Sequence, residues 1–224
     1  MRAIRIWYKK SGHAVYISHL DLYRTMSRAI RRAQIPIWYT EGFNPKPYLN
    51  FLLPLPLGIE ALCEPIDLKI DGEIQDDEIV KRLNDVLPTG LEILKASSAE
   101  CSVNEVRFAS YNISLELDSN ENAESFAQEC ENLVASQSII AEKMGKSGRR
   151  KVAKQINLCD NIEKFHAKAI NVTVNIQAVL SAGNSANLNP FLLINAFKSY
   201  IETDLLHITI SRTSLLKADF SNFE

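Results

Sequence analysis

Residues 18–33 read SHLDLYRTMSRAIRRA and predict the first helix of the chain. Ser18 is a residue type favoured at helix N-caps, and Asp21 three residues later suits the first turn. Pro36 limits how far the helix can extend. One side of the predicted helix can be covered by Leu20, Tyr23, Met26, Ile30 and Ala33.

Residues on both sides of this helix alternate between apolar and polar and predict strands. The first half begins with extended segments at Arg2–Tyr8 and Ala14–Ile17, which Gly12 interrupts as a bulge or a turn and which together precede the helix. Further strands are predicted at Ile35–Thr40, Pro65–Ile70 and Leu91–Ala96, with a second helix over Asp76–Leu87. Four prolines between residues 45 and 56 predict a rigid loop that continues to about Gly58. The resulting order, β-α-β-β-α-β, is typical of a ferredoxin-like domain.

The second half predicts the same order. Its predicted elements are strands at Phe108–Leu117, Ala169–Ala178 and Leu206–Arg212, helices at Glu121–Ala135 and Pro190–Ile201, and a weakly defined strand and loop over residues 138–162. Asn189 is the expected N-cap of the last helix, with Pro190 in its first position. We therefore expect an α+β fold of two tandem ferredoxin-like domains, residues 1–100 and 101–224, divided near Ser97–Arg107.

The composition is that of an ordinary globular protein. Of 224 residues, 46% are hydrophobic and 23% are charged, which argues against disorder, collagen and a small disulfide scaffold. The four cysteines form no C-x-x-C pair, so we expect free thiols in a reducing cytoplasm and no metal or cofactor. Neither a signal peptide nor a transmembrane helix is expected, since the longest uncharged stretch is rich in asparagine.

Charge is unevenly distributed along the chain. Residues 1–58 carry nine Lys/Arg and two Asp/Glu, whereas residues 59–142 carry five basic and nineteen acidic residues. Within the first segment, Arg24, Arg28 and Arg31 are spaced i, i+4, i+7 and line one helix face, with Arg32 beside them. Arginine suits phosphate because it donates two parallel hydrogen bonds. The pattern predicts either an anion-binding surface, plausibly for RNA, or a solvated face whose arginines pair with the acidic segment.

A second basic segment, residues 143–154, carries six Lys/Arg and no acidic residue. Its glycines and charge predict a flexible basic loop in which Arg149, Arg150 and Lys151 contact a nucleic-acid backbone. The alternative is a solvated hairpin tip.

The rigid loop carries further candidate residues. Tyr39, Phe43, Asn44 and Lys46 could stack on a base or hold a ligand, or the loop could simply pack over the sheet. His19 stands in the first turn of the predicted arginine-bearing helix. It could act as a general base on a phosphodiester, or only fix the chain where it enters the helix.

Several stretches resemble the radical-SAM-associated (radical-SAM-linked) domain family, a bacterial family of undefined function, in its stand-alone form. They are Ile17–Leu22, Arg28–Ala33, the pair Pro36 and Tyr39, Gly42–Pro47 and Leu53–Gly58. The resemblance is dense over residues 1–70 and implies association with a separate cobalamin-dependent radical SAM protein and an RNA context. Lys46 stands where the family pattern usually has a second histidine. The chain lacks the C-x-x-x-C-x-x-C cluster motif, so it is not expected to be the radical SAM enzyme itself.

Three functions remain open at this point. The first is a non-catalytic accessory module that binds RNA, tRNA or rRNA, for a radical SAM enzyme. Its expected phosphate ligands are Arg24, Arg28, Arg31, Arg32, Lys46, Arg149, Arg150 and Lys151, with Tyr39 and Phe43 as stacking groups. The second is a metal-independent endoribonuclease with His19 as base and Arg28 or Lys46 stabilising developing charge. The third is a protein-binding adaptor without RNA contact.

Overall fold

The computed structural model describes residues 1–147, 150–184 and 186–223, with side chains described outside residues 143–154. Within this part of the chain the fold is mixed α+β, with a large, mostly antiparallel sheet and four α-helices. The chain divides into two units. Unit 1 comprises Met1–Glu105, Ser211–Ser214 and Asn222–Glu224, and unit 2 comprises Val106–Ile210 and Leu215–Ser221.

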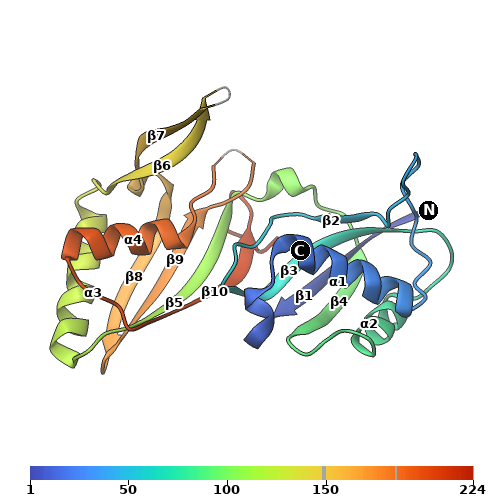
Figure 1. Cartoon of the computed structure of the whole chain (residues 1–224), viewed down its shortest axis with the longest axis horizontal. Helices are drawn as coiled ribbons and strands as arrows, with labels where there is room; N and C mark the ends of the chain where they lie inside the picture. Colours follow the sequence, from blue (N-terminus) through green and yellow to red (C-terminus); the bar gives the residue numbers. More distant parts are fainter. Residues whose placement is uncertain (148–149, 185, 224) are drawn as a thin grey trace. The chain divides into compact units, whose positions relative to one another are not determined.

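Unit 1 begins with a strand, a short 3-10 helix and the arginine-bearing helix. Its elements are β1 (Arg2–Lys10), η1 (Gly12–Tyr16), α1 (His19–Arg32), β2 (Leu49–Phe51), β3 (Ile59–Ile70), α2 (Asp76–Asn84), β4 (Leu91–Ser98) and η2 (Val103–Glu105). β1 lies between β3 and β4, and β2 pairs with β3, all antiparallel. Helices α1 and α2 lie over one face of this sheet (Figure 1). Residues Ser211–Ser214 of β10 (His207–Leu216) complete the unit.

The core of unit 1 follows from the alternation along the strands. Ile4 and Ile6 of β1 are fully buried, as are Ile66 and Leu68 opposite them on β3. The apolar stripe of α1 is buried too, through Leu22, Met26, Ala29 and Ile30. Burial of each of the larger side chains, Leu22, Met26 and Ile30, stabilises the fold by about 1.5–3 kcal/mol, so this stripe fixes the orientation of α1.

A buried network of ionisable groups lies within unit 1. Arg212 of β10 donates two hydrogen bonds to the carboxylate of Glu64, one of them 2.6 Å from Nη2 to Oε2, and a third to the Leu53 carbonyl. Burial raises the pKa of Glu64, against the opposing effects of Arg212 and Lys10. Burial also raises the pKa of Tyr8 above its usual range. Because Glu64 and Arg212 are removed from water, removing either partner would leave the other as a buried, unpaired charge.

The lowered pKa of Lys10, in the same network, predicts how the free energy of unfolding depends on pH. Burial lowers its pKa from 10.5 to about 8, although Glu64 favours the charged form. Between those two pH values the unfolded chain binds the proton more tightly, so stability should rise with pH. From pH 7 to 9.5 the gain from this group is about 2 kcal/mol. Urea unfolding at both pH values should show this gain in the wild type and not in Lys10→Met. An equal change in both proteins would contradict the assignment.

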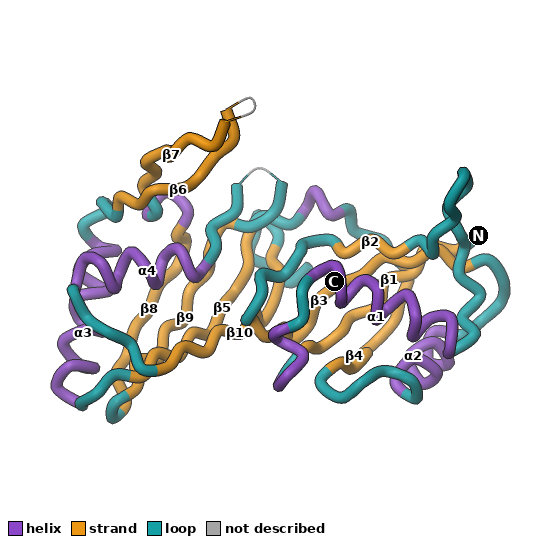
Figure 2. Tube along the Cα trace, in the orientation of Figure 1, coloured by secondary structure: helices purple, strands orange, loops and turns teal. Residues whose placement is uncertain are grey.

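Unit 2 is built in the same order with an added hairpin. Its elements are β5 (Phe108–Glu116), α3 (Asn120–Ala135), β6 (Ile140–Ser147), β7 (Arg150–Asn157), η3 (Cys159–Asn161), β8 (Ile162–Ile170), β9 (Thr173–Ser181), α4 (Pro190–Ile201) and part of β10. The strand order is β10-β5-β9-β8, and α3 and α4 lie over one face (Figure 1). β6 and β7 form a separate two-stranded sheet that projects beyond α4 (Figure 2). No helix in the described ranges is long and apolar enough to cross a bilayer.

Helix starts are confirmed where a cap decides them. The Ser18 side chain accepts a hydrogen bond from the Asp21 amide, and Asn189 accepts one from the Phe191 amide. In contrast, the predicted strand at Ala14–Ile17 is wrong. This segment forms η1, because the Ser11 and Ala14 carbonyls accept short-range turn hydrogen bonds. The predicted strand at Ile35–Thr40 is reduced to isolated bridges, and the strand in this region is β2.

Two predictions in the second half are corrected. The single strand predicted at Ala169–Ala178 is two strands, β8 and β9, joined by a two-residue turn at Asn171 (φ 55°). The segment 143–154, predicted as a flexible loop, lies mostly in the paired strands β6 and β7, because each strand satisfies the backbone of the other. Residues 148–149 at its tip lie outside the described residues.

Candidate nucleic-acid interface

Helix α1 presents the predicted arginine face to solvent. Its apolar stripe is buried, and Arg24, Arg28, Arg31 and Arg32 are exposed. Because Cβ positions three or four residues apart share one helix face, burial of Met26 and Ile30 turns the arginines outward. The face is therefore a consequence of how the core fixes this helix.

The first of two hollows on this face lies between α1 and the loop before β2. It has a volume of about 340 Å³ and is lined by Leu20, Tyr23, Arg24, Ser27, Arg28, Arg31, Lys46 and Pro47. The Tyr23 hydroxyl donates a hydrogen bond of 3.3 Å to the Pro47 carbonyl, which links helix and loop. This contact brings Lys46 to the same hollow as Arg24, Arg28 and Arg31.

The second hollow lies on the α2–β4 side of the same helix. Its volume is about 450 Å³, and it is lined by Thr25, Arg28, Arg31, Arg32 and Pro88. Arg28 and Arg31 thus line both hollows, and neither lining contains an acidic residue. We call the exposed set Arg24, Arg28, Arg31, Arg32 and Lys46 the α1 cationic surface.

The partners of these arginines leave most of their charge uncompensated. Arg24 pairs with Asp21 of its own helix at 3.2 Å, and the hydrogen bonds from Ser18 and Arg24 lower the pKa of Asp21. Arg31 donates to the Tyr39 hydroxyl, and Arg32 to the Val86 carbonyl. Among the described residues, Arg28 makes no hydrogen bond or ion pair, and none of the four arginines forms an ion pair with an acidic residue of segment 59–142.

The loop beside this surface is closed at its base. The Thr40 amide donates to the Lys46 carbonyl at 2.9 Å, and the Lys46 amide donates to the Thr40 hydroxyl at 3.1 Å. Phe43 is fully exposed at 108%, and Asn44 is also exposed. The Tyr39 ring lies 5.9 Å from the Arg31 guanidinium. Phe43 is therefore available as a stacking group, whereas Tyr39 is engaged with Arg31.

His19 lies apart from this surface. It is the first residue of α1, and its ring packs edge-on against Phe51 at 5.0 Å. His19 and Arg28 are nine positions apart, which is two and a half helical turns and about 13 Å along the axis. The two side chains therefore project from opposite sides of α1, and His19 lines neither hollow. The structure therefore does not bring His19 together with Arg28, one of the two charge-stabilising candidates of the ribonuclease hypothesis.

Among the second basic segment's candidates, Arg149 lies outside the described residues, and Arg150 and Lys151 lie in β7, paired with Ser147 and Lys146. Within the described ranges no three His, Cys, Asp or Glu side chains gather as metal ligands. A cation–aromatic cluster that the sequence analysis missed lies near the loop. The Lys69 ammonium is 4.6 Å from the Tyr48 ring and 5.0 Å from the Trp38 ring. In the sequence, this cluster could have been predicted from Trp38 and Tyr48, the aromatic residues on either side of the loop.

Comparisons with solved structures find remote similarities. A chain in "Crystal Structure of a Cbf5-Nop10-Gar1 Complex" has a TM-score of 0.49 and 10% identity, covering 95% of this chain and 48% of that one. This chain thus spans about half the length of that relative. An unknown protein from Galdieria sulphuraria has a TM-score of 0.27 and 9% identity, covering 94% of this chain and 98% of that one. Similarities this remote assign no function.

No curated protein matches the sequence. Residues 3–190, well over half of the chain, match the bacterial family described as "Uncharacterized protein conserved in bacteria (DUF2344)". The chain therefore belongs to this family.

Proposed function

We propose that the protein binds RNA through the α1 cationic surface. The observation that carries the proposal is the sharing of Arg28 and Arg31 by two acid-free hollows, with Lys46 brought in from the loop. A run of phosphates could contact several of these side chains at once, and each such contact releases counterions. The exposed Phe43 adds an aromatic side chain on which an unpaired base can stack.

We further propose a role for this RNA binding. The resemblance of residues 17–58 to radical-SAM-associated domains supports an accessory role, in which tRNA or rRNA is held for a separate cobalamin-dependent radical SAM enzyme. No catalytic role is assigned to His19, since its position gives that role no support.

We also propose a ferredoxin-like fold for each of the two units. Both are consistent with ferredoxin-like domains, because β4-β1-β3-β2 and β10-β5-β9-β8 place corresponding strands in the same order. In unit 2 the β6–β7 hairpin would then be an insertion between α3 and β8.

The test is RNA binding by fluorescence anisotropy at 50 and 200 mM salt. Arg28→Glu/Arg31→Glu should bind single-stranded RNA about 100-fold more weakly than the wild type, because each charge-assisted contact contributes about 1.5 kcal/mol. Its plot of log affinity against log salt should be shallower by about 1.4, the value for two lost phosphate contacts.

The matched control is Lys81→Glu/Lys198→Glu, which changes net charge equally but lies outside both hollows. It should retain the wild-type salt dependence. Absence of RNA binding by folded wild type would reject the proposal and favour the protein-binding adaptor.

A further inference from the structure

The sheet of unit 2 has a second face that its helices do not cover. Along β5 and β9, the buried side chains of Tyr111, Ile113, Val174 and Ile176 alternate with exposed or half-exposed ones. Helices α3 and α4 lie over one face of this sheet (Figure 1), and we assign the buried set to that face because packing against helices removes side chains from solvent. The alternate set, including Asn112 and Gln177, therefore lies on the open face, because successive side chains of a strand point to opposite sides.

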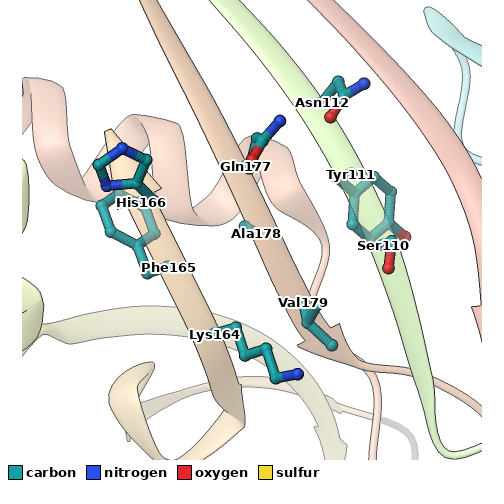
Figure 3. A pocket seen from close by; sticks show the side chains of 9 residues that line it. All are labelled: Ser110, Tyr111, Asn112, Lys164, Phe165, His166, Gln177, Ala178 and Val179. Carbon is teal, nitrogen blue, oxygen red and sulfur yellow. The ribbon is translucent and has the colours of Figure 1, made fainter. Parts of the chain in front are cut away.

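Strand pairing arranges this open face in three rows. The register gives the rows Ser110–Val179–Lys164, Asn112–Gln177–His166 and Ser114–Asn175–Lys168 across β5, β9 and β8. The first two rows, together with Tyr111, Phe165 and Ala178 between them, line a shallow pocket of about 380 Å³. Figure 3 shows Asn112, Gln177 and His166 side by side on three strands. We call the nine residues of the three rows the unit 2 sheet face.

The chemistry of this face is graded from one strand to the next. Basic side chains follow β8 at every second residue, through Lys164, His166 and Lys168, and none of the nine residues is acidic. Amide side chains lie on the other two strands, with Asn112 on β5 and Asn175 and Gln177 on β9. Amides both donate and accept hydrogen bonds, as the edges of unpaired bases require.

Two side chains of the basic column are held in place by residues outside the rows. The His166 Nδ1 lies 3.2 Å from Oε1 of Glu131 on α3, and the same oxygen accepts a 2.6 Å hydrogen bond from the Ala167 amide. Glu131 therefore contacts Nδ1 of the His166 ring, and Nε2 is the ring nitrogen that a ligand can reach. The Lys164 ammonium lies 4.6 Å from the Phe220 ring, which stacks on Phe108 at 4.8 Å.

We propose that the unit 2 sheet face binds a short stretch of single-stranded RNA, with phosphates along the β8 column and base edges over the amides. The three rows span about 13 Å along the strands and about 10 Å across them, which suits roughly three nucleotides. An acidic peptide would match the charge of the basic column. Its carboxylates only accept hydrogen bonds, so they would not use both the donors and the acceptors of the amide side chains. The inference rests on the proposed RNA binding but assigns it a second, separate site.

The test compares a single-stranded RNA octamer with a duplex of the same sequence. Lys164→Glu/Lys168→Glu should weaken octamer binding about 100-fold and reduce the salt slope by about 1.4. Asn112→Ala/Gln177→Ala should weaken it about tenfold without changing the salt slope. Duplex binding should change less than twofold in the amide variant. Lys81→Glu/Lys198→Glu serves as the charge-matched control, and thermal unfolding verifies that each variant is folded.

A measurement on the unaltered protein accompanies the variants. The octamer should slow the acetylation of Lys164 and Lys168 at least fivefold, with no such effect at Lys81. Unchanged octamer binding in the folded variants, or acetylation that the octamer does not slow, would overturn the inference. Displacement of the octamer by polyglutamate at equal charge concentration would also overturn it, in favour of an acidic protein partner.

The variants distinguish failure of one proposed site from failure of the other. Binding that depends on Arg28 and Arg31 but not on Lys164 and Lys168 would leave the α1 cationic surface standing and reject the sheet face. The reverse dependence would reject the α1 cationic surface and retain the sheet face. Wild type that binds no RNA would reject both.

Discussion

Arg212→Leu is expected to lower the free energy of unfolding by about 3–5 kcal/mol, as measured by urea denaturation at pH 7. The reason is the environment of Glu64, whose side chain is 2% exposed and receives two hydrogen bonds from Arg212. Without the guanidinium, a carboxylate remains buried, and the Lys10 ammonium is the charge that still favours its ionised form. The unfolded state can hydrate this carboxylate, and the folded state cannot.

The pH dependence of this loss identifies its cause. In Arg212→Leu the folded-state pKa of Glu64 should rise further above its unfolded value, so stability falls as pH rises through that range. The variant should therefore be less impaired at pH 5 than at pH 7.

A double replacement separates the lost pair from the stranded charge. Glu64→Leu/Arg212→Leu should recover most of the lost stability, because replacing both partners by apolar groups is often neutral. Arg24→Leu, which removes an exposed arginine paired with Asp21, should leave the urea midpoint close to that of the wild type. An Arg212→Leu variant as stable as Arg24→Leu would contradict the assignment.

Gly90→Ala is expected to lower the free energy of unfolding by about 3 kcal/mol. Gly90 has φ +90°, and a Cβ there would lie 2.6 Å from the Ser11 carbonyl oxygen and 2.9 Å from Cβ of Ala14. The Ser11 amide also donates a 2.9 Å hydrogen bond to the Gly90 carbonyl. The two backbone segments are thus held together and cannot separate to admit a methyl group without losing this bond.

Gly42→Ala is the matched control for this prediction. Gly42 also has a positive φ, +133°, but a Cβ there would meet nothing within 4 Å. It should show only the backbone cost, about 1 kcal/mol. Urea unfolding of both variants measures the difference, and equal losses would show that the close approach at Gly90 carries no energetic weight.

Elements fixed by local signals could be predicted from the sequence. Helix α4 begins and ends where Asn189, Pro190 and the apolar spacing place it, because caps act within one turn. Strand boundaries depend on partners far along the chain. The β8–β9 turn was hidden because a two-residue turn preserves the parity of the alternation from Ile170 to Val174.

The candidate site shows the same division. The helical spacing of Arg24, Arg28 and Arg31 predicts their common face, because the pattern is local. The approach of Lys46 depends on the Tyr23–Pro47 contact between helix and loop, which no sequence period encodes. His19 is close to the arginines in sequence, yet the helical rotation places it on the side opposite Arg28.

The division of β10 between the two units has a consequence during protein synthesis. Glu64 precedes Arg212 by 148 residues, yet both belong to unit 1. At bacterial elongation rates of up to about 20 residues per second, Arg212 is added about 7 s or more after Glu64. During that interval unit 1 lacks Ser211–Ser214 of β10, and the Glu64 carboxylate lacks the Arg212 guanidinium that donates hydrogen bonds to it. The Glu64–Arg212 pair of unit 1 can therefore form only after nearly all of unit 2 has been synthesised.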